Sequence, residues 1–257
     1  MLKCFDLTGE TAIVTGAAKG LGRVFARALA QAGADIYLMG HGEEGMQETA
    51  REITSLGVQC AWRYAEITDQ SQVEACIKDC INRFGKVDIL VNNAAAPRIN
   101  IPPEETDLDQ WNQVLNTNIT GSFICAQAAG KEMMKRRKGK IINLASISGF
   151  IINKGVHGGS YDVSKQAVVG LTRALAAEWA PYHINVNAIA PGYFLTDPNK
   201  NFFKQDPEFY NLALSMIPAQ RIGDPEELSG AVVFLASEAS SYMHGSVLVI
   251  DGGYTIW

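Results

Sequence analysis

The sequence predicts a doubly wound α/β fold, with one seven-stranded parallel sheet and helices on both of its faces. Short apolar runs rich in β-branched residues alternate with longer amphipathic segments along the whole chain. The apolar runs lack the polar alternation of a half-exposed strand, which indicates strands that are buried on both faces. Because no linker, low-complexity tract or internal repeat interrupts the 257 residues, we expect residues 1–257 to form a single domain.

The predicted elements follow one another as strand and helix. Each predicted strand is a short β-branched apolar run, and in chain order these runs are Ala12–Thr15, Asp35–Met39, Gln59–Tyr64, Asp88–Asn92, Lys140–Leu144, Ile184–Ile189 and Ser246–Ile250. Each predicted helix is an amphipathic segment between them, and these segments are Leu21–Ala32, Met46–Leu56, Ser71–Phe84, Leu108–Lys135, Tyr161–Ala180 and Pro225–Ser237. A basic run at residues 135–140 fits the end of the fourth helix, where cations are favourable and Gly139 suits a cap.

The segment at about residues 193–218 is the largest irregular insertion in this alternating pattern. It carries four aromatic residues, Phe202, Phe203, Phe209 and Tyr210. Long insertions in compact domains are frequently active-site covers. We therefore expect this segment to form a mobile helical lid over the substrate.

Composition and charge exclude several classes of protein. The chain is 47% hydrophobic and 19% charged, and its net charge is −5. These values are close to the globular average and argue against disorder, coiled coils and collagen-like repeats. The mildly acidic balance argues against nucleic acid as a partner. No apolar run is long enough for a membrane span, and the N-terminus lacks the apolar core of a secretory signal, so we expect a cytoplasmic protein without a membrane partner.

The cysteines and histidines do not predict a metal site. The five cysteines are an odd number without a disulfide framework, and we expect reduced thiols. Cys76 and Cys80 lie four residues apart on a predicted helix, but no matching Cys or His pair accompanies them. The four histidines show no ligand spacing.

A glycine-rich turn, residues 15–22, joins the first predicted strand to the first predicted helix. Glycines at this junction permit a tight turn and let a phosphate approach bare backbone, while the helix N-terminus offers unpaired N–H groups. An ordinary strand-to-helix turn is the alternative, but the position favours a dinucleotide-binding (Rossmann) domain. The residues predicted to contact the cofactor here are Gly16, Lys19, Gly20, Leu21 and Gly22.

The end of the second predicted strand bears on the choice between NAD(H) and NADP(H). An NAD site places an acidic residue there to bind the ribose hydroxyls, but this chain has Gly40. Lys19 in the turn and His41 after the strand are candidates to meet a 2′-phosphate. The pattern favours NADP(H) over NAD(H), although His41 is equally interpretable as a plain surface residue.

A tyrosine and a lysine predict acid–base chemistry. Tyr161 and Lys165 begin the helix after the fifth predicted strand, and their four-residue spacing puts them on one helix face. A phenol has an ordinary pKa of about 10, and a nearby ammonium lowers it towards the range that suits proton transfer. Ser146 ends the fifth predicted strand, and Asn92 and Asn93 end the fourth. These polar groups are predicted to meet at the carboxyl edge of the sheet.

Together these motifs resemble the short-chain dehydrogenase/reductase family over essentially the whole chain, from Gly9 onwards. The matching elements are the turn at 15–22, the run at 92–94, Asn118 within 116–119, Ser146, the pair Tyr161 and Lys165, and the run at 190–192. The resemblance implies a catalytic tetrad. In it, Tyr161 transfers the proton and Ser146 hydrogen-bonds the substrate oxygen. Lys165 holds the nicotinamide ribose and lowers the Tyr161 pKa, and Asn118 anchors a water that leads to Lys165.

The resemblance also implies further cofactor contacts, and the chain departs from the family at one of them and beside another. Glu66 replaces the aspartate that usually lies near adenine, and Ala95 replaces a glycine after Asn93. The family also uses the apolar faces of the helices at 108–135 and 161–180 to form a homotetramer. The implied cofactor contacts are Glu66, Ile67, Asn93, Tyr161, Lys165, Pro191, Gly192, Phe194 and Thr196.

The C-terminal residues 251–257 resemble the ending of gluconate 5-dehydrogenases and related sugar-acid and polyol enzymes. We therefore predict NAD(P)-dependent interconversion of a ketone and a secondary alcohol on such a substrate. A 3-oxoacyl thioester reductase is the alternative within the family, and a non-catalytic NAD(P)-binding regulator is the alternative outside it. Four polar residues are candidates for substrate contacts or solvated loop positions: Arg98, Asn100, Asn153 and His157.

Overall fold

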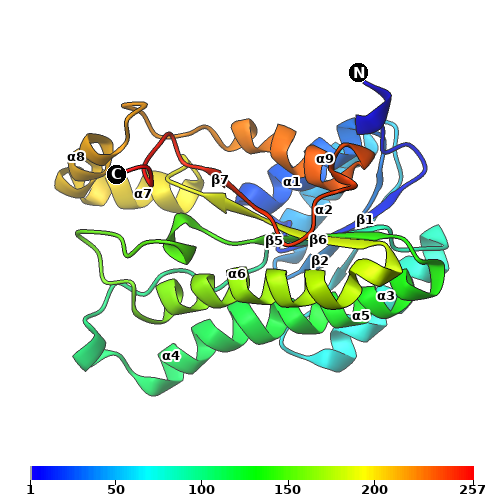
Figure 1. The fold of residues 1–257 in the computed structure, drawn as a ribbon, viewed down its shortest axis with the longest axis horizontal. Coiled ribbons are helices and arrows are strands. Elements are labelled where there is room, and N and C mark those ends of the chain that lie inside the picture. Colours follow the sequence, from blue (N-terminus) through cyan, green and yellow to red (C-terminus); the bar gives the residue numbers. More distant parts are fainter. Residues whose placement is uncertain (1) are drawn as a thin grey trace.

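In the computed structural model, which describes residues 2–257, seven parallel strands form one sheet in the order β3-β2-β1-β4-β5-β6-β7 (Figure 1). The strand order reverses between β1 and β4, which is where doubly wound sheets bind ligands. This confirms the predicted fold class. The strands are β1 (Thr11–Thr15), β2 (Asp35–Gly40), β3 (Cys60–Tyr64), β4 (Ile89–Asn92), β5 (Gly139–Leu144), β6 (Ile184–Pro191) and β7 (Val247–Ile250).

Helices cover both faces of the sheet (Figure 1). One face packs against α1 (Gly20–Gln31), α2 (Glu43–Thr54) and α9 (Ser229–Ala236). The other packs against α3 (Gln70–Phe84), α5 (Ser122–Arg136) and α6 (Gly159–Trp179). None of the helices within residues 2–257 is both long and apolar enough to cross a bilayer.

Successive residues of the central strands enter the two cores in turn. In β1, Val14 joins the core under α1 and α9, while its neighbour Ile13 joins the core under α3 and α5. Both side chains are fully buried. This is why the strands read as continuous apolar runs without polar alternation.

The predicted helix over residues 108–135 is a composite. α4 (Leu108–Leu115) is followed by a π-helical segment, Asn116–Gly121, and then by α5. One extra residue per turn in such a segment reorients the side chains that follow, and π-helical turns are frequent at functional sites. Apolar periodicity does not reveal this local change in winding, because the residues on either side remain helical.

The predicted irregular insertion contains two helices, α7 (Asp197–Gln205) and α8 (Pro207–Met216). They pack through a small apolar cluster that is separate from the two cores beside the sheet. Phe203 and Phe209 of these helices lie against Ile147, at the end of β5, and Tyr254, near the C-terminus. This packing places α7 and α8 beside the carboxyl ends of the strands, at the side of the molecule shared with the C-terminus (Figure 1).

Candidate active site

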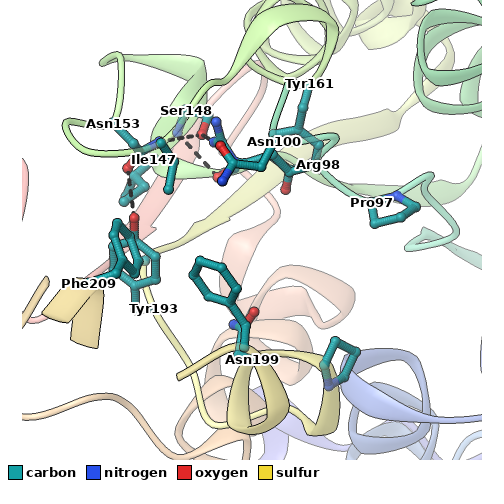
Figure 2. Close-up of a pocket in the computed structure, with 15 residues that line it drawn as sticks. Pro97, Arg98, Asn100, Ile147, Ser148, Asn153, Tyr161, Tyr193, Asn199 and Phe209 are labelled. Atoms are coloured by element: carbon teal, nitrogen blue, oxygen red, sulfur yellow. Dashed lines mark hydrogen bonds between the residues drawn. The ribbon is translucent and has the colours of Figure 1, made fainter. Parts of the chain in front are cut away.

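Polar side chains from several strand ends gather around one cavity at the carboxyl edge of the sheet. The cavity has a volume of about 380 Å³. Ser146 follows β5, Tyr161 begins α6 and Gly192 follows β6, and all three line the cavity. Its opposite wall comes from α7 and α8, which contribute Asn199, Phe202 and Phe209 (Figure 2).

The chain that follows β4 completes the cavity wall. Pro97, Arg98 and Asn100 lie in this loop and line the cavity together with Asn153 (Figure 2). Three of the four substrate candidates predicted from the sequence are therefore cavity residues. The fourth, His157, is outside the wall and donates its backbone N–H to the Asn100 side chain at 2.7 Å.

Lys165 is buried one helical turn after Tyr161. Its Nζ donates to the Leu144 carbonyl oxygen at 2.7 Å and lies 5.6 Å from the centre of the Tyr161 ring. Burial lowers the pKa of the Lys165 ammonium to about 8. The predicted four-residue spacing thus brings the two side chains together on one helix face.

The pKa of the Tyr161 phenol is raised, because burial disfavours the phenolate. The Arg98 guanidinium, 4.9 Å from the centre of the Tyr161 ring, and the Ser146 hydroxyl both oppose this shift. The sequence predicts that Lys165 lowers this pKa, and that role stays a prediction. The net shift of the Tyr161 pKa is upward, and Arg98 and Ser146 are the groups that act against it. Arg98 is 63 positions from Tyr161 in the chain, so local spacing gives no signal of this contact.

Ser146 lies where β5 turns into a short 3-10 helix, Ile147–Gly149. Its backbone is extended, and its Oγ accepts a hydrogen bond from the Ser148 N–H at 3.2 Å. This bond caps the 3-10 turn and fixes the hydroxyl at the cavity wall. A hydroxyl can accept one bond and still donate another, so Ser146 remains able to donate to a substrate oxygen.

Asn118 sits in the π-helical segment and connects it to two other parts of the site. Its Oδ1 accepts from the Ala96 N–H at 2.7 Å, and its Nδ2 donates to the Ser164 Oγ at 2.9 Å. The residue is 2% exposed. Asn118 therefore joins the loop after β4 to α6, at the residue immediately before Lys165.

The glycine-rich turn has the geometry of a phosphate-binding backbone. Gly20 has a positive φ of 58°, and a Cβ there would meet nothing within 4 Å, so its backbone faces open space. A Cβ on Gly22 would collide with the Gly16 carbonyl oxygen, which means that the turn closes only with glycine. No side chain caps the N-terminus of α1 within the described residues. Its first N–H groups therefore remain available to a pyrophosphate.

Asn93 supports this turn from the end of β4. Its Nδ2 donates to the carbonyl oxygens of Thr15, at 2.9 Å, and Gly16, at 3.1 Å. The Thr15 hydroxyl in turn accepts from the Asn93 and Ala94 N–H groups, each at 2.9 Å. These hydrogen bonds connect the carboxyl ends of β1 and β4 beneath the glycine-rich turn.

The predicted adenine-side residues divide into surface and core positions. His41 is exposed and Glu66 is half-buried, and His41 Nε2 lies 3.1 Å from Glu66 Oε2. Lys19 flanks the turn at the start of α1. Ile67 is 3% exposed and packs against the π-helical segment, where a Cβ on Gly121 would come within 2.7 Å of it. Ile67 therefore has a packing role in addition to any backbone contact with a cofactor.

The residues after β6 show a similar division. Pro191 ends the strand, and Gly192 packs closely on Asp251, whose Cα would lie 2.8 Å from a Cβ on Gly192. The Phe194 ring is 4% exposed and lies against Gly223, so it faces the protein interior. Its backbone carbonyl accepts from the Thr196 N–H at 2.8 Å, which orders the start of α7.

Some residues of the site were not singled out from the sequence, and Asp162 is the charged one among them. Asp162, between Tyr161 and Ser164, is 2% exposed and accepts a hydrogen bond from Arg98 Nη2 at 2.6 Å. Ser148 Oγ accepts from both Arg98 Nη2, at 2.9 Å, and Asn153 Nδ2, at 2.8 Å. An acidic residue directly after the proposed acid–base tyrosine is the signal that would have found it.

The chain matches known proteins over nearly its whole length. Residues 16–255 match a family model described as enoyl-(acyl carrier protein) reductase. Galactitol 2-dehydrogenase (L-tagatose-forming) of Cereibacter sphaeroides is 41% identical over 254 residues, which are 98% of each chain.

Solved structures match as closely. A short-chain type dehydrogenase/reductase of Mycobacterium marinum superposes with a TM-score of 0.91 and 38% identity, over 99% of this chain and 98% of its own. A gluconate 5-dehydrogenase of Burkholderia cenocepacia J2315, in complex with NADP and tartrate, superposes with a TM-score of 0.93 and 36% identity, over 100% of this chain and 99% of its own. From its fold, its site and its full-length relatives, the chain belongs to the short-chain dehydrogenase/reductase family of NAD(P)-dependent enzymes.

Proposed function

We propose that the protein interconverts a ketone and a secondary alcohol on a sugar acid or polyol, with NADP(H) favoured over NAD(H). The observation that carries this proposal is the position of Ser146 and Tyr161 in the wall of the cavity at the carboxyl edge. The amide and hydroxyl groups of the same wall suit a substrate rich in hydroxyls. The relatives that act on galactitol and on gluconate support the substrate class.

The catalytic roles follow from the geometry of the site. Tyr161 gives its phenolic proton to the carbonyl oxygen in the reductive direction and takes it back in the oxidative direction. Ser146 donates a hydrogen bond to the same oxygen and stabilises the negative charge that develops on it. Lys165, 5.6 Å from the Tyr161 ring centre, supplies a positive charge to the proton path. A bound nicotinamide supplies or accepts the hydride.

Asn118 is proposed to organise the proton path. Its side chain is fully engaged between Ala96 and Ser164, so it fixes the helix turn that carries Lys165. In the family resemblance, the corresponding asparagine anchors a water that leads to the lysine. The buried position of Asn118 supports such a role.

The cofactor is proposed to lie along the strand ends from the glycine-rich turn towards Tyr161. The open backbone at Gly20 and the uncapped start of α1 suit its pyrophosphate. Asn93, Pro191, Gly192 and Thr196 would hold its nicotinamide half. The backbone of Phe194 would contribute there, since its ring faces the interior.

The preference for NADP(H) is proposed from the absence of an acid at Gly40 and from the basic groups Lys19 and His41. A Cβ on Gly40 would lie 3.1 Å from the Gly16 nitrogen, so a side chain at this position would contact the glycine-rich turn. Glu66, paired with His41, weakens the preference, because its carboxylate repels a 2′-phosphate. The ratio of kcat/KM for NADPH and NADH tests the proposal, and a ratio below one contradicts it.

Two further features extend the proposal. The helices α7 and α8 are proposed to form a lid over the cavity, since they supply one wall of it and pack through a cluster separate from the two cores beside the sheet. We also place the enzyme in the cytoplasm as a homotetramer that acts on a small molecule, as the family resemblance implies.

A substrate panel tests the function directly. Purified protein is assayed with NADPH and NADH against 5-ketogluconate, a series of ketoses and an acetoacetyl thioester. The proposal predicts the highest kcat/KM for a sugar-derived ketone. Preference for the thioester would instead identify a 3-oxoacyl reductase. Binding of NADPH without turnover of any carbonyl would identify a non-catalytic regulator.

A further inference from the structure

The cavity beside Tyr161 has a single charge in its wall. Among the described residues that line it, only Arg98 is ionised at neutral pH, and the others are apolar or carry neutral amide and hydroxyl groups. A guanidinium in a cavity wall ordinarily favours an anionic substrate, because its planar fork matches a carboxylate. The state of Arg98 therefore decides between a sugar acid and a neutral polyol.

Arg98 already has hydrogen-bond partners within the protein. Its Nη2 donates to Asp162 Oδ1 at 2.6 Å and to Ser148 Oγ at 2.9 Å, which uses both of its hydrogens. Figure 2 shows the bond to Ser148. Its Nη1 makes no hydrogen bond with any residue from 2 to 257, but it is fully buried, so a group in the cavity has no open surface through which to reach it. Nη2 has no hydrogen left and Nη1 is enclosed, so the guanidinium does not present paired N–H groups to a carboxylate in the cavity.

Asp162 also cancels the charge of Arg98. The Asp162 side chain is 3% exposed and that of Arg98 is 20% exposed, so solvent screens the pair weakly. Opening a buried ion pair leaves an uncompensated charge in a medium of low dielectric, which is costly. A substrate carboxylate would have to compete with Asp162 for the guanidinium and would be repelled by it.

The backbone is shaped around this carboxylate. A Cβ on Gly158 would collide with Asp162 Oδ2, and it would lie 2.7 Å from Arg98 Nη1. Glycine at position 158 therefore leaves the space that the ion pair occupies. Because Asp162 is in the first turn of α6, the helix that carries Tyr161 and Lys165 also fixes the direction of its carboxylate.

We infer that Asp162 determines specificity: by neutralising Arg98, it makes the cavity select a neutral polyol or ketose over a sugar acid. This inference rests on the proposed function and narrows its substrate class from two to one. The amide and hydroxyl groups that remain in the wall, including Asn100, Asn199 and Ser146, match hydroxyl groups without adding charge.

Matched substrates that differ only at one terminal carbon test the inference. Sorbitol and gluconate, and galactitol and galactonate, are compared as substrates for NADP⁺ reduction. We expect kcat/KM for the polyol to exceed that for the acid in the wild type. In Asp162→Asn, the ratio of kcat/KM for acid to that for polyol rises about tenfold or more, because one like charge near the bound carboxylate is removed.

Two other variants complete the comparison. Arg98→Gln leaves Asp162 unpaired and is expected to lower the acid-to-polyol ratio below that of the wild type, the opposite sign. Glu178→Gln is the matched control, because Glu178 is an exposed carboxylate on the same helix. A wild type that prefers the acids, or an Asp162→Asn ratio equal to that of Glu178→Gln, overturns the inference.

A binding measurement separates this inference from the proposed function. The unfolding temperature of each NADP-saturated variant is measured in equal concentrations of gluconate and sorbitol. Gluconate is expected to stabilise Asp162→Asn more than the wild type, even if no sugar is turned over. Failure of turnover on all four compounds counts against the proposed function, whereas unchanged stabilisation by gluconate counts against the role of Asp162.

Discussion

Lys165 places an ammonium group where its side chain is 3% exposed, with the Leu144 carbonyl as its hydrogen-bond acceptor. Burial lowers the pKa of this lysine from 10.5 to about 8. Because the folded-state pKa lies below that of the unfolded chain, the charged lysine destabilises the fold below pH 8, and this cost disappears as the pH rises towards 10.5. The Lys165 ammonium is buried beside Tyr161 although its burial lowers the stability of the fold. Such a group is a candidate for a catalytic role.

The position of Lys165 predicts a pH dependence. We expect kcat/KM for carbonyl reduction to be level below pH 8 and to fall as the pH rises through about 8, where the ammonium loses its proton. The phenol of Tyr161 stays protonated over this range, because burial raises its pKa. Initial rates in constant-ionic-strength buffers measure the profile.

The matched variant for this profile is Lys165→Arg, whose guanidinium keeps its charge throughout the range. The fall near pH 8 should then be absent, although the overall rate is lower. If the variant retains the same fall, another group is responsible for it.

Removal of the phenolic hydroxyl gives the second prediction at this scale. Tyr161→Phe should lower kcat by about 10³-fold or more, since the variant lacks the phenolic proton that is proposed to reach the carbonyl oxygen. Cofactor affinity, measured by NADPH fluorescence, should change little, because the ring is retained. Tyr242→Phe, at a fully exposed tyrosine, serves as the control. Residual activity close to that of the control would exclude Tyr161 as the acid–base group.

At the scale of elements, sequence patterns predicted the junctions of strands and helices better than their internal details. The sequence predicts the carboxyl end of each central strand, since the apolar run stops where polar residues such as Asn92 or Ser146 begin. The π-helical segment around Asn118 was not readable, because its winding depends on buried hydrogen bonds to Ala96 and Ser164. The same holds for the pair of Arg98 and Asp162, which joins residues 64 positions apart.

The junction of β1 and α1 gives a prediction at the element scale. Gly22→Ala should weaken NADPH binding by about tenfold or more, because the added methyl group collides with the Gly16 carbonyl and displaces the phosphate turn. Gly230→Ala in α9 is the control, since a Cβ there meets nothing within 4 Å. Equal NADPH affinities in the two variants, measured by calorimetry, would mean that the turn tolerates a side chain.

At the scale of the whole molecule, a parallel sheet brings distant segments to one edge, which is how Ser146 and Tyr161 come to line one cavity. The proposed site adds the residues at 16–22, 93, 118 and 165 from neighbouring segments. This convergence was predictable, because every strand of the sheet runs in the same direction. The arrangement of the lid was not, since α7 and α8 owe their placement to an aromatic cluster formed with Ile147 and Tyr254. That the segment acts as a lid stays a prediction, and the sequence did not predict that α7 and α8 supply a wall of the cavity.

The molecular surface supports the proposed assembly. β7 lies at the edge of the sheet and, among the strands within residues 2–257, pairs only with β6; its Val249 is 40% exposed. Exposed apolar residues also occur on the outer helices, at Phe123 of α5 and Val163 of α6. An open strand edge and exposed apolar helix faces promote aggregation unless another subunit covers them.

Light scattering tests the assembly. We expect a mass about four times the 27.9 kDa of one chain. Val249→Lys, at the strand edge, should reduce this mass by disrupting the packing of one chain on another, because an uncompensated charge is costly at a buried interface. Leu2→Lys, which adds the same charge at an exposed apolar residue outside these faces, should leave the mass unchanged. A wild-type mass near 27.9 kDa would show that these faces remain open to solvent.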